Sequence, residues 1–300
     1  MFTGCGTALV TPFRQDLTVD EEAVRRLVRR QIEGGINFLV PCGTTGESPT
    51  LSHEELLRVV EITVDEARGK IPVMAGAGGY NTAEVISLAK ELAELGVDGL
   101  LSVTPYYNKP TQEGLYQHYK AIANAVALPI FVYSIQKRTG VNVEPATLKR
   151  LAEIDNIVGV KEASGDISQI ASVLGQVPPG FTVLSGDDAV ALPLIAMGGR
   201  GLISVASNEI PAEMTRLVQL CLGDDFQAAR RLQRKYLPLM EVNFVETSPG
   251  PVKVAMAAMG LLEAVWRLPL VAPKPEAAEK ILRVLNSLGM LEGKHATTTN

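Results

Sequence analysis

The sequence predicts a parallel (β/α)₈ barrel, an α/β TIM barrel, with a C-terminal three-helix extension. Short apolar runs rich in β-branched residues recur along the chain at the spacing of one strand–helix unit, with amphipathic segments between them. The runs are continuously apolar, which is typical of strands covered on both faces. A doubly wound nucleotide-binding sheet is disfavoured because neither a G-x-G-x-x-G turn nor a P-loop motif is present.

The runs that we expect to form the strands share this apolar composition and lie at residues 6–10, 37–42, 72–76, 99–104, 130–134, 157–161, 182–186 and 201–206. The expected barrel helices have one apolar face each. They lie at residues 20–33, 82–95, 112–126, 145–153, 166–174, 189–197 and 211–221, and one more begins after Ser52. Ser52 and Glu55 have the spacing of a capping box, which predicts the start of that helix.

Strand-like runs end near residue 222. Three further helices are expected at 225–240, 251–265 and 275–288, separated by proline- and glycine-containing segments. The predicted organisation is therefore a barrel over 1–222 that contains the active site, a helical extension over 223–291, and a polar tail over 292–300 that we expect to be disordered.

Composition excludes several classes of protein. Hydrophobic residues make up 46% of the chain and charged residues 20%, which excludes intrinsic disorder. The net charge of −5 and the lack of a basic patch disfavour nucleic-acid binding. No apolar run is long enough for a bilayer, no signal-peptide pattern is present, and the three cysteines are far apart. We therefore expect a soluble cytoplasmic protein with no membrane contact.

In a barrel of this kind the active site lies at the C-terminal ends of the strands. Lys161 closes the strand predicted at 157–161, and alternation would place it on the same face as Gly159 and Ile157. If that face points inward, the ammonium is buried, and burial favours the neutral amine that attacks carbonyl groups. Alternatively, Lys161 faces outward or pairs with Glu162 or Asp187.

Other polar residues occupy equivalent positions. Tyr133 could relay protons to a carbinolamine, or could be a core tyrosine. Thr44 and Thr45, between two glycines, could hold a carboxylate, or could form an ordinary turn. The pair Tyr106–Tyr107 could serve simple packing at a subunit contact.

Metal-dependent and serine-dependent chemistry is disfavoured. His53, His118 and His295 are dispersed, no Cys/His cluster exists, and no G-x-S-x-G elbow is present. We therefore expect no metal and no cofactor.

Several motifs together carry a family resemblance: Gly43-Thr-Thr-Gly-Glu47, Tyr106-Tyr107, Tyr133, Arg138-Thr-Gly140 and Val160-Lys-Glu-Ala163. With these motifs the chain resembles the dihydrodipicolinate synthase/N-acetylneuraminate lyase family of class I pyruvate aldolases, from about residue 2 to residue 291. The residues of the first motif and the presence of Arg138 favour the synthase branch.

The resemblance implies a reaction and a set of roles. Lys161 would form a Schiff base with pyruvate, and Thr44, Tyr133 and Tyr107 would relay protons, with Tyr107 reaching into the adjacent subunit. The second substrate would be L-aspartate 4-semialdehyde, and the product 4-hydroxy-tetrahydrodipicolinate would enter lysine and diaminopimelate biosynthesis. The assembly would be a homotetramer, a dimer of dimers. The implied binding residues are Thr45 for the pyruvate carboxylate, Arg138 for the second carboxylate, and Gly186 and Ile203 as lining residues. A lysine feedback site is matched only in part, at Ser48, His53, Glu84 and Tyr106.

The chain departs from the family pattern beside Arg138. Ser134, Gln136 and Lys137 stand where the family has an Asn-x-Pro-x-Arg pattern, and Ser248 stands where it has Asn. The missing proline would free the backbone of this loop. Two alternatives therefore remain: another class I pyruvate aldolase, such as a 4-hydroxy-2-oxoglutarate type, and a non-catalytic barrel that binds a keto acid.

Overall fold

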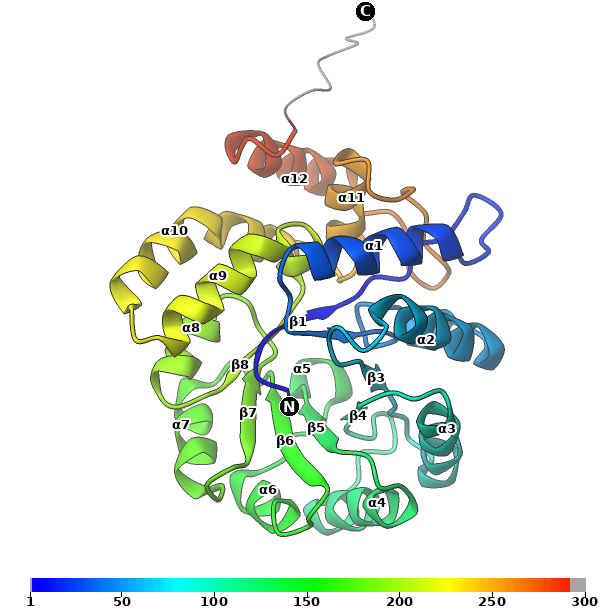
Figure 1. Cartoon of the computed structure of the whole chain (residues 1–300), viewed down its shortest axis with the longest axis vertical. Helices are drawn as coiled ribbons and strands as arrows, with labels where there is room; N and C mark the ends of the chain where they lie inside the picture. The colour runs from blue at the N-terminus through cyan, green and yellow to red at the C-terminus, as the bar shows by residue number, and fades with distance from the viewer. Residues whose placement is uncertain (1, 292–300) are drawn as a thin grey trace, which may run out of the picture.

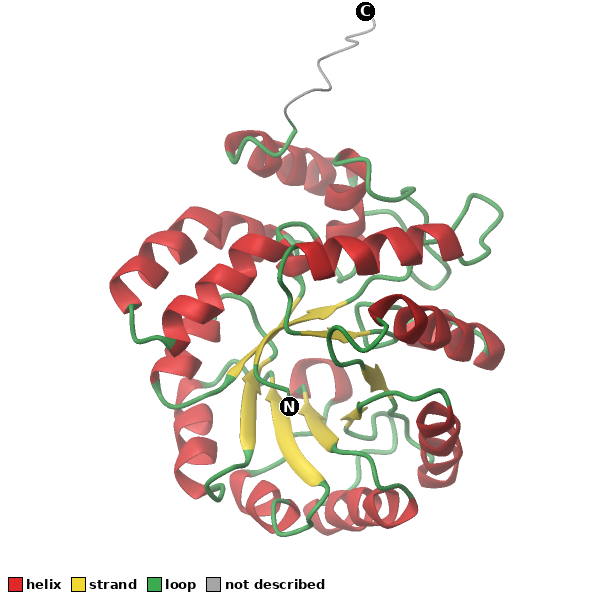
Figure 2. Ribbon diagram, viewed as in Figure 1, coloured by secondary structure: helices red, strands yellow, loops and turns green. Residues whose placement is uncertain are grey.

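The structure is a computed structural model that describes residues 2–291. Eight parallel strands form a barrel, and helices surround it (Figures 1 and 2). The strands are β1 (Gly4–Ala8), β2 (Phe38–Val40), β3 (Met74–Gly76), β4 (Gly99–Val103), β5 (Ile130–Ser134), β6 (Ile157–Glu162), β7 (Thr182–Ser185) and β8 (Gly201–Ser204). A parallel bridge between Leu39 and Val73 joins β2 to β3 and closes the ring. The predicted barrel is confirmed.

The helices follow the predicted order. They are α1 (Glu21–Glu33), α2 (His53–Ala67), α3 (Thr82–Glu94), α4 (Gln112–Ala125), α5 (Gln136–Thr139), α6 (Pro145–Leu151), α7 (Ile167–Gln176), α8 (Ala191–Ala196), α9 (Pro211–Leu222), α10 (Phe226–Val242), α11 (Gly250–Ala258) and α12 (Pro275–Ser287). Two short 3₁₀ turns, η1 (Ser48–Thr50) and η2 (Ala206–Asn208), follow β2 and β8. The tail predicted over 292–300 lies outside the described residues.

Side-chain caps set where several helices begin. The capping box predicted at Ser52 and Glu55 is present: the Ser52 hydroxyl accepts from the Glu55 N–H at 3.2 Å, and the Glu55 carboxylate accepts from the Ser52 N–H at 2.9 Å. The side chains of Asp20, Thr111 and Asp166 likewise accept from backbone N–H groups at the starts of α1, α4 and α7, without a reciprocal capping box. Each cap satisfies backbone N–H groups that the first helical turn leaves unpaired.

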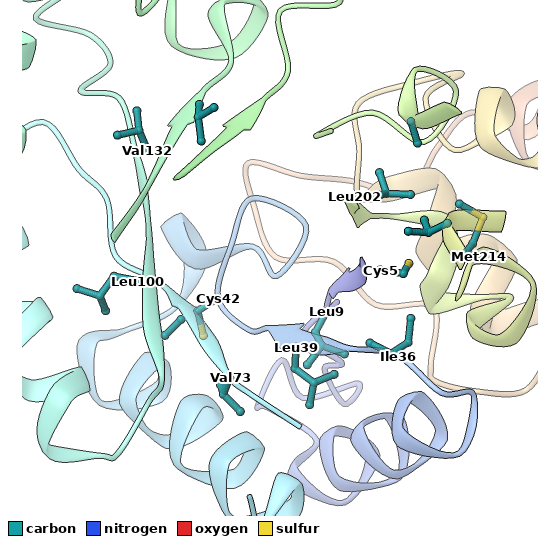
Figure 3. Close-up of a cluster of buried hydrophobic side chains, with 14 of the residues drawn as sticks. Cys5, Leu9, Ile36, Leu39, Cys42, Val73, Leu100, Val132, Leu202 and Met214 are labelled. Atoms are coloured by element: carbon teal, nitrogen blue, oxygen red, sulfur yellow. The ribbon is translucent and has the colours of Figure 1, made fainter. Parts of the chain in front are cut away.

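Two apolar cores lie on the two faces of the strands. The larger core packs the outer faces of the strands against the helices, and Figure 3 shows part of it around Leu39, Leu100 and Val132. The smaller core fills the barrel and includes Phe131, Tyr133, Leu184 and Ile203. Side chains of alternate strand residues therefore point to different cores, as the strand period requires.

One prediction about β6 is wrong. Ile157 packs in the outer core and does not share a face with Gly159, because the pairing of β5 with β6 shifts register between Ile130 and Phe131. Ile130 lies opposite Ile157, whereas Phe131 lies opposite Gly159, so Val158 is the extra residue of a bulge. A bulge reverses the inward–outward alternation of the side chains that follow it. The face on which Lys161 lies must therefore be determined from the residues after the bulge, 159–162.

The helix predicted over 251–265 is also too long, since α11 ends at Ala258. Gly260 follows with φ of +76°, a left-handed conformation that ends helices and that glycine adopts without strain. The remainder of the predicted segment runs as loop into α12. Val252 and Met256 of α11 pack with Val10 and Val205, at the ends of β1 and β8, so the extension lies against the barrel.

No helix among residues 2–291 is long and apolar enough to cross a membrane.

Glu66 of α2 forms ion pairs with two arginines of α1. Its carboxylate accepts two hydrogen bonds from Arg29, at 2.7 and 2.8 Å, and one from Arg25 at 3.0 Å. These interactions, chiefly with Arg29, lower the pKa of Glu66 to about 2. A lowered folded-state pKa adds stability above the unfolded-state pKa of about 4.3, and the contribution is lost as the pH falls toward 2.

We therefore expect Glu66→Gln to lower the free energy of unfolding by about 1–2 kcal/mol at pH 7, allowing for solvent screening at Arg29. The difference from the parent protein should shrink at pH 3. Urea unfolding at both pH values measures it, with the exposed Glu94→Gln as control. An equal difference at both pH values would contradict this explanation.

Candidate active site

Lys161 lies inside the barrel. On β6 it pairs in register with Tyr133 of β5, a residue of the inner core, and its Nζ lies 4.3 Å from the centroid of the Tyr133 ring. Lys161 is only 5% exposed, and it forms no ion pair with any residue between 2 and 291. The inward orientation is therefore the one observed, and the amine faces apolar and phenolic groups.

The alternative partner Glu162 belongs to a different network. Its carboxylate accepts from the N–H of Ser164 and, at 3.1 Å, from the amide of Gln169, whose amide also donates to Asn142. Burial raises the pKa of Glu162 because the carboxylate loses its hydration. This network ties the loop after α5 to the end of β6, next to Lys161.

A cavity of about 320 Å³ opens above the inner core. It is lined by three of the predicted active-site residues: Thr44, Tyr133 and Arg138. The rest of its wall is mainly apolar and glycine-rich, and includes Cys42, Gly43, Gly76, Ala77, Leu101, Val103, Ile135 and Thr139. A small polar substrate would thus meet a few defined polar groups in a largely apolar pocket.

The turn after β2 brings Thr44 to this cavity. Gly46 and Glu47 donate their N–H groups to the carbonyls of Gly43 and Thr44, both at 3.1 Å. The Thr11 hydroxyl donates to the Gly46 carbonyl at 2.6 Å and anchors the turn from β1. Thr45 is 5% exposed and is not among the cavity-lining residues.

The predicted loop after β5 forms a helical turn, α5, which the sequence analysis missed. The Gly140 N–H donates to the Gln136 carbonyl with Gly140 at φ +71°, and the hydroxyls of Thr139 and Ser134 accept from the N–H groups of Val141 and Val143. These bonds fix the loop without the proline of the family pattern.

The two cations of α5 point to different places. Arg138 lines the cavity, and its Nη2 donates to the Ser248 carbonyl at 3.0 Å. The Nζ of Lys137 lies toward Gly165, 3.5 Å from the position that a Cβ on that glycine would take. The orientation of the two side chains favours Arg138 over Lys137 as the group that meets a substrate.

Gly186 lies beside the lysine, and neither Gly186 nor Ile203 is among the cavity-lining residues. A Cβ on Gly186 would stand 3.0 Å from Cε of Lys161 and 2.7 Å from Cβ of Ala163. Ile203 packs in the inner core with Tyr133. The absence of a side chain at 186 therefore leaves room for Lys161.

Tyr107 does not line the cavity of its own chain. It is 89% exposed and adopts φ of +65°, an uncommon conformation for a bulky residue. Its neighbour Tyr106 does line the cavity, and burial raises the pKa of Tyr106. The tyrosine pair thus presents one ring to the cavity and the other to the surface.

A second cavity, of about 490 Å³, adjoins the first and shares Gly78, Leu88 and Tyr106 with it. Three residues of the predicted feedback site, His53, Glu84 and Tyr106, line it. Ser48 lines the first cavity instead. The predicted feedback residues therefore surround the boundary between the two cavities.

Sequence reasoning missed one element of the site, the ion pair of Glu47 with Lys253 at 2.7 Å. Both side chains are fully buried. The signal was available, since Lys253 is the only charged residue of α11, in the apolar sequence GPVKVAMAA. An isolated charge on an otherwise apolar helix indicates a buried partner.

A model of the "Dihydrodipicolinate synthetase family" matches residues 1–288. The chain belongs to this family. It is similar to the 4-hydroxy-tetrahydrodipicolinate synthases of Koribacter versatilis and Chloroherpeton thalassium. It is 55% identical to the first over 98% of each chain, and 51% identical to the second over 97% of this chain and 96% of the other. The crystal structure of dihydrodipicolinate synthase from Thermotoga maritima superposes with a TM-score of 0.95 at 46% identity, covering 97% of this chain and all of the other.

For this member of the dihydrodipicolinate synthetase family, we expect Gly186→Ala to impair the reaction of Lys161. The added methyl would displace the lysine, and the rate of trapping by a keto acid and borohydride should fall roughly 10- to 100-fold. Mass spectrometry of the trapped protein over time measures that rate. Gly175→Ala, in α7, is the matched control, because nothing lies within 4 Å of its added Cβ. Equal trapping rates for the two variants would contradict the crowding argument.

Proposed function

We propose that this enzyme condenses pyruvate with L-aspartate 4-semialdehyde to 4-hydroxy-tetrahydrodipicolinate, the reaction named by its relatives, in lysine and diaminopimelate biosynthesis. The observation that carries the proposal is the buried Lys161, which has no ion-pair partner within residues 2–291 and lies over the ring of Tyr133, a residue that lines the cavity together with Thr44 and Arg138. Such an amine is suited to attack a keto acid, and we propose that the reaction needs no cofactor.

The chemistry begins at Nζ of Lys161. The neutral amine attacks C2 of pyruvate, and the carbinolamine loses water to give an imine. Loss of a proton from C3 gives an enamine, whose C3 forms a bond to the aldehyde carbon of the second substrate. Attack of the amino group of that substrate on the imine carbon closes the ring and releases Lys161, so one water leaves overall.

The positions of several residues in the structure support the roles that we propose for them. Nζ of Lys161 lies 4.3 Å from the centre of the Tyr133 ring, and Tyr133 and Thr44 both line the cavity, so these two residues are proposed to relay protons to and from the carbinolamine. Thr45 and the N–H groups of its turn are proposed to hold the pyruvate carboxylate, and Arg138 to hold the second carboxylate. Gly186 is proposed to leave room for the amine, and Ile203 to line the site from the inner core.

Assembly and location extend the proposal. We propose a cytoplasmic homotetramer, a dimer of dimers, in which Tyr107 completes the proton relay of the adjacent subunit. Its exposure of 89% on a strained turn supports that role, because a single chain gives the ring nothing to pack on. The second cavity, at His53, Glu84 and Tyr106, is proposed as a regulatory site. Ser48, the fourth predicted regulatory residue, lines the first cavity.

A specific observation favours one alternative function. Ser134, Gln136 and Lys137 differ from the family pattern beside Arg138, so a class I aldolase of the 4-hydroxy-2-oxoglutarate type stays the second candidate. Both candidates share the pyruvate half of the site, so only the aldehyde distinguishes them. A non-catalytic keto-acid-binding barrel is the third, and trapping separates it from both.

Pyruvate with borohydride should inactivate the protein irreversibly and modify Lys161, because reduction of the imine fixes the substrate to the amine. Peptide mass spectrometry locates the label. Lys161→Ala should lose at least about a thousandfold in kcat, whereas the exposed Lys149→Ala should retain activity. A label on another lysine, or none, would refute the Schiff-base assignment.

Arg138→Ala should lower kcat/KM for L-aspartate 4-semialdehyde by roughly one to three decades, since a charge-assisted bidentate contact is lost. Trapping of pyruvate should hardly change. Lys137→Ala is the matched control and should behave like the parent enzyme, because its amine points toward Gly165. A larger loss in Lys137→Ala would reverse the assignment.

Tyr107 should act in trans. Mixing inactive Lys161→Ala subunits with inactive Tyr107→Phe subunits should restore part of the activity once subunits exchange, because some sites then contain both residues. Native mass spectrometry verifies the mixed oligomers, and steady-state assays measure recovery. Verified mixtures with no recovery would show that each site is completed by its own chain.

A further inference from the structure

The ion pair of Glu47 with Lys253 joins the active-site turn to the helical extension. Nζ of Lys253 donates to Oε1 of Glu47 at 2.7 Å and to the Thr11 carbonyl at 3.1 Å, and it lies 4.3 Å from the centroid of the Phe13 ring. Neither side chain is exposed. Residues from three distant segments, after β1, after β2 and in α11, therefore meet at a single ammonium group.

Glu47 ends the turn that carries Thr44 and Thr45. It adopts φ of +55°, a left-handed conformation that a residue with a side chain adopts at a cost. Its N–H bonds the Thr44 carbonyl at 3.1 Å, so the position of its backbone sets that of Thr44. The buried carboxylate thus holds a strained residue three positions from a predicted catalytic hydroxyl.

Fold stability alone gives no reason for this pair. Burial raises the pKa of Glu47 and lowers that of Lys253, because both charged forms lose hydration, and their mutual attraction offsets only part of each shift. Oε2 of Glu47 has no hydrogen-bond partner within residues 2–291. An apolar pair of similar volume is often as stabilising as a buried ion pair, so a directional role explains the pair better.

We propose that Glu47 and Lys253 are positioning residues, which hold the Thr44–Thr45 turn in the conformation that binds the pyruvate carboxylate. The inference rests on the proposed function, since it assigns the turn to pyruvate. It extends that function to α11, outside the barrel. Thr11 contributes by bonding both the ammonium, through its carbonyl, and the Gly46 carbonyl, through its hydroxyl.

The test compares Glu47→Gln, Lys253→Met and the double variant, in which both residues are neutral and nearly isosteric with the originals. Borohydride trapping at increasing pyruvate concentration gives a half-saturating concentration and a maximal rate, and thermal unfolding gives stability. Glu55→Gln is the matched control, because Glu55 pairs with Arg267 of the same extension at 2.6 Å but lies outside the turn.

We expect the single variants to lose stability and the double variant to regain most of it. The half-saturating pyruvate concentration should rise roughly tenfold in all three, including the stable double variant, with a smaller change in the maximal rate. Glu55→Gln should keep the parent value.

A folded double variant with parent-like pyruvate saturation would overturn the proposal, as would a double variant that cannot fold, since the pair would then serve the fold alone. Trapping of the parent protein distinguishes failure of this proposal from failure of the proposed function. If pyruvate and borohydride do not trap the parent, the proposed function itself fails.

Discussion

The buried contact between Glu47 and Lys253 is the constraint on which the site depends. A barrel provides strand ends, but its loops need support to hold a fixed geometry. Here the C-terminal extension supplies that support twice, through the Lys253 ammonium of α11 on the turn after β2 and through the carbonyl of Ser248, just before α11, on Arg138 of α5. Removing one partner of such a pair typically costs about 3–5 kcal/mol, because the other charge stays buried. The extension is therefore part of the active site.

The position of Lys161 depends on packing inside the barrel. The bulge at the start of β6 determines which residues face inward, and it places Lys161 opposite Tyr133. The missing side chain at Gly186 leaves space for the lysine, and Leu184, its register partner on β7, is fully buried in the inner core. A lysine in these surroundings has no carboxylate partner within the described part of the chain. This isolation distinguishes it from Lys253, whose charge is paired, and suits it to covalent chemistry.

Much of this could be predicted from local signals. The apolar runs gave the eight strands, and the capping box at Ser52 gave the start of α2. Lys161 became a candidate because a lone cation ended an apolar strand, and the family resemblance supplied the role proposed for it. Other features depend on tertiary contacts. The bulge that reorients Ile157 comes from pairing with β5, and α5 forms because its hydrogen bonds replace the restraint of a proline. The partners Glu47 and Lys253 are 206 residues apart in sequence, so only the fold brings them together. The role proposed for Tyr107 depends on a neighbouring chain, which no sequence pattern within one chain describes.

The central claim is that this site joins pyruvate to L-aspartate 4-semialdehyde. The most direct measurement is kcat/KM for pyruvate consumption with a panel of aldehydes that includes the semialdehyde, glyoxylate and an uncharged aldehyde of similar length. We expect the highest kcat/KM with L-aspartate 4-semialdehyde, with 4-hydroxy-tetrahydrodipicolinate as the product. Preferred turnover of glyoxylate, with no product from the semialdehyde, would contradict it.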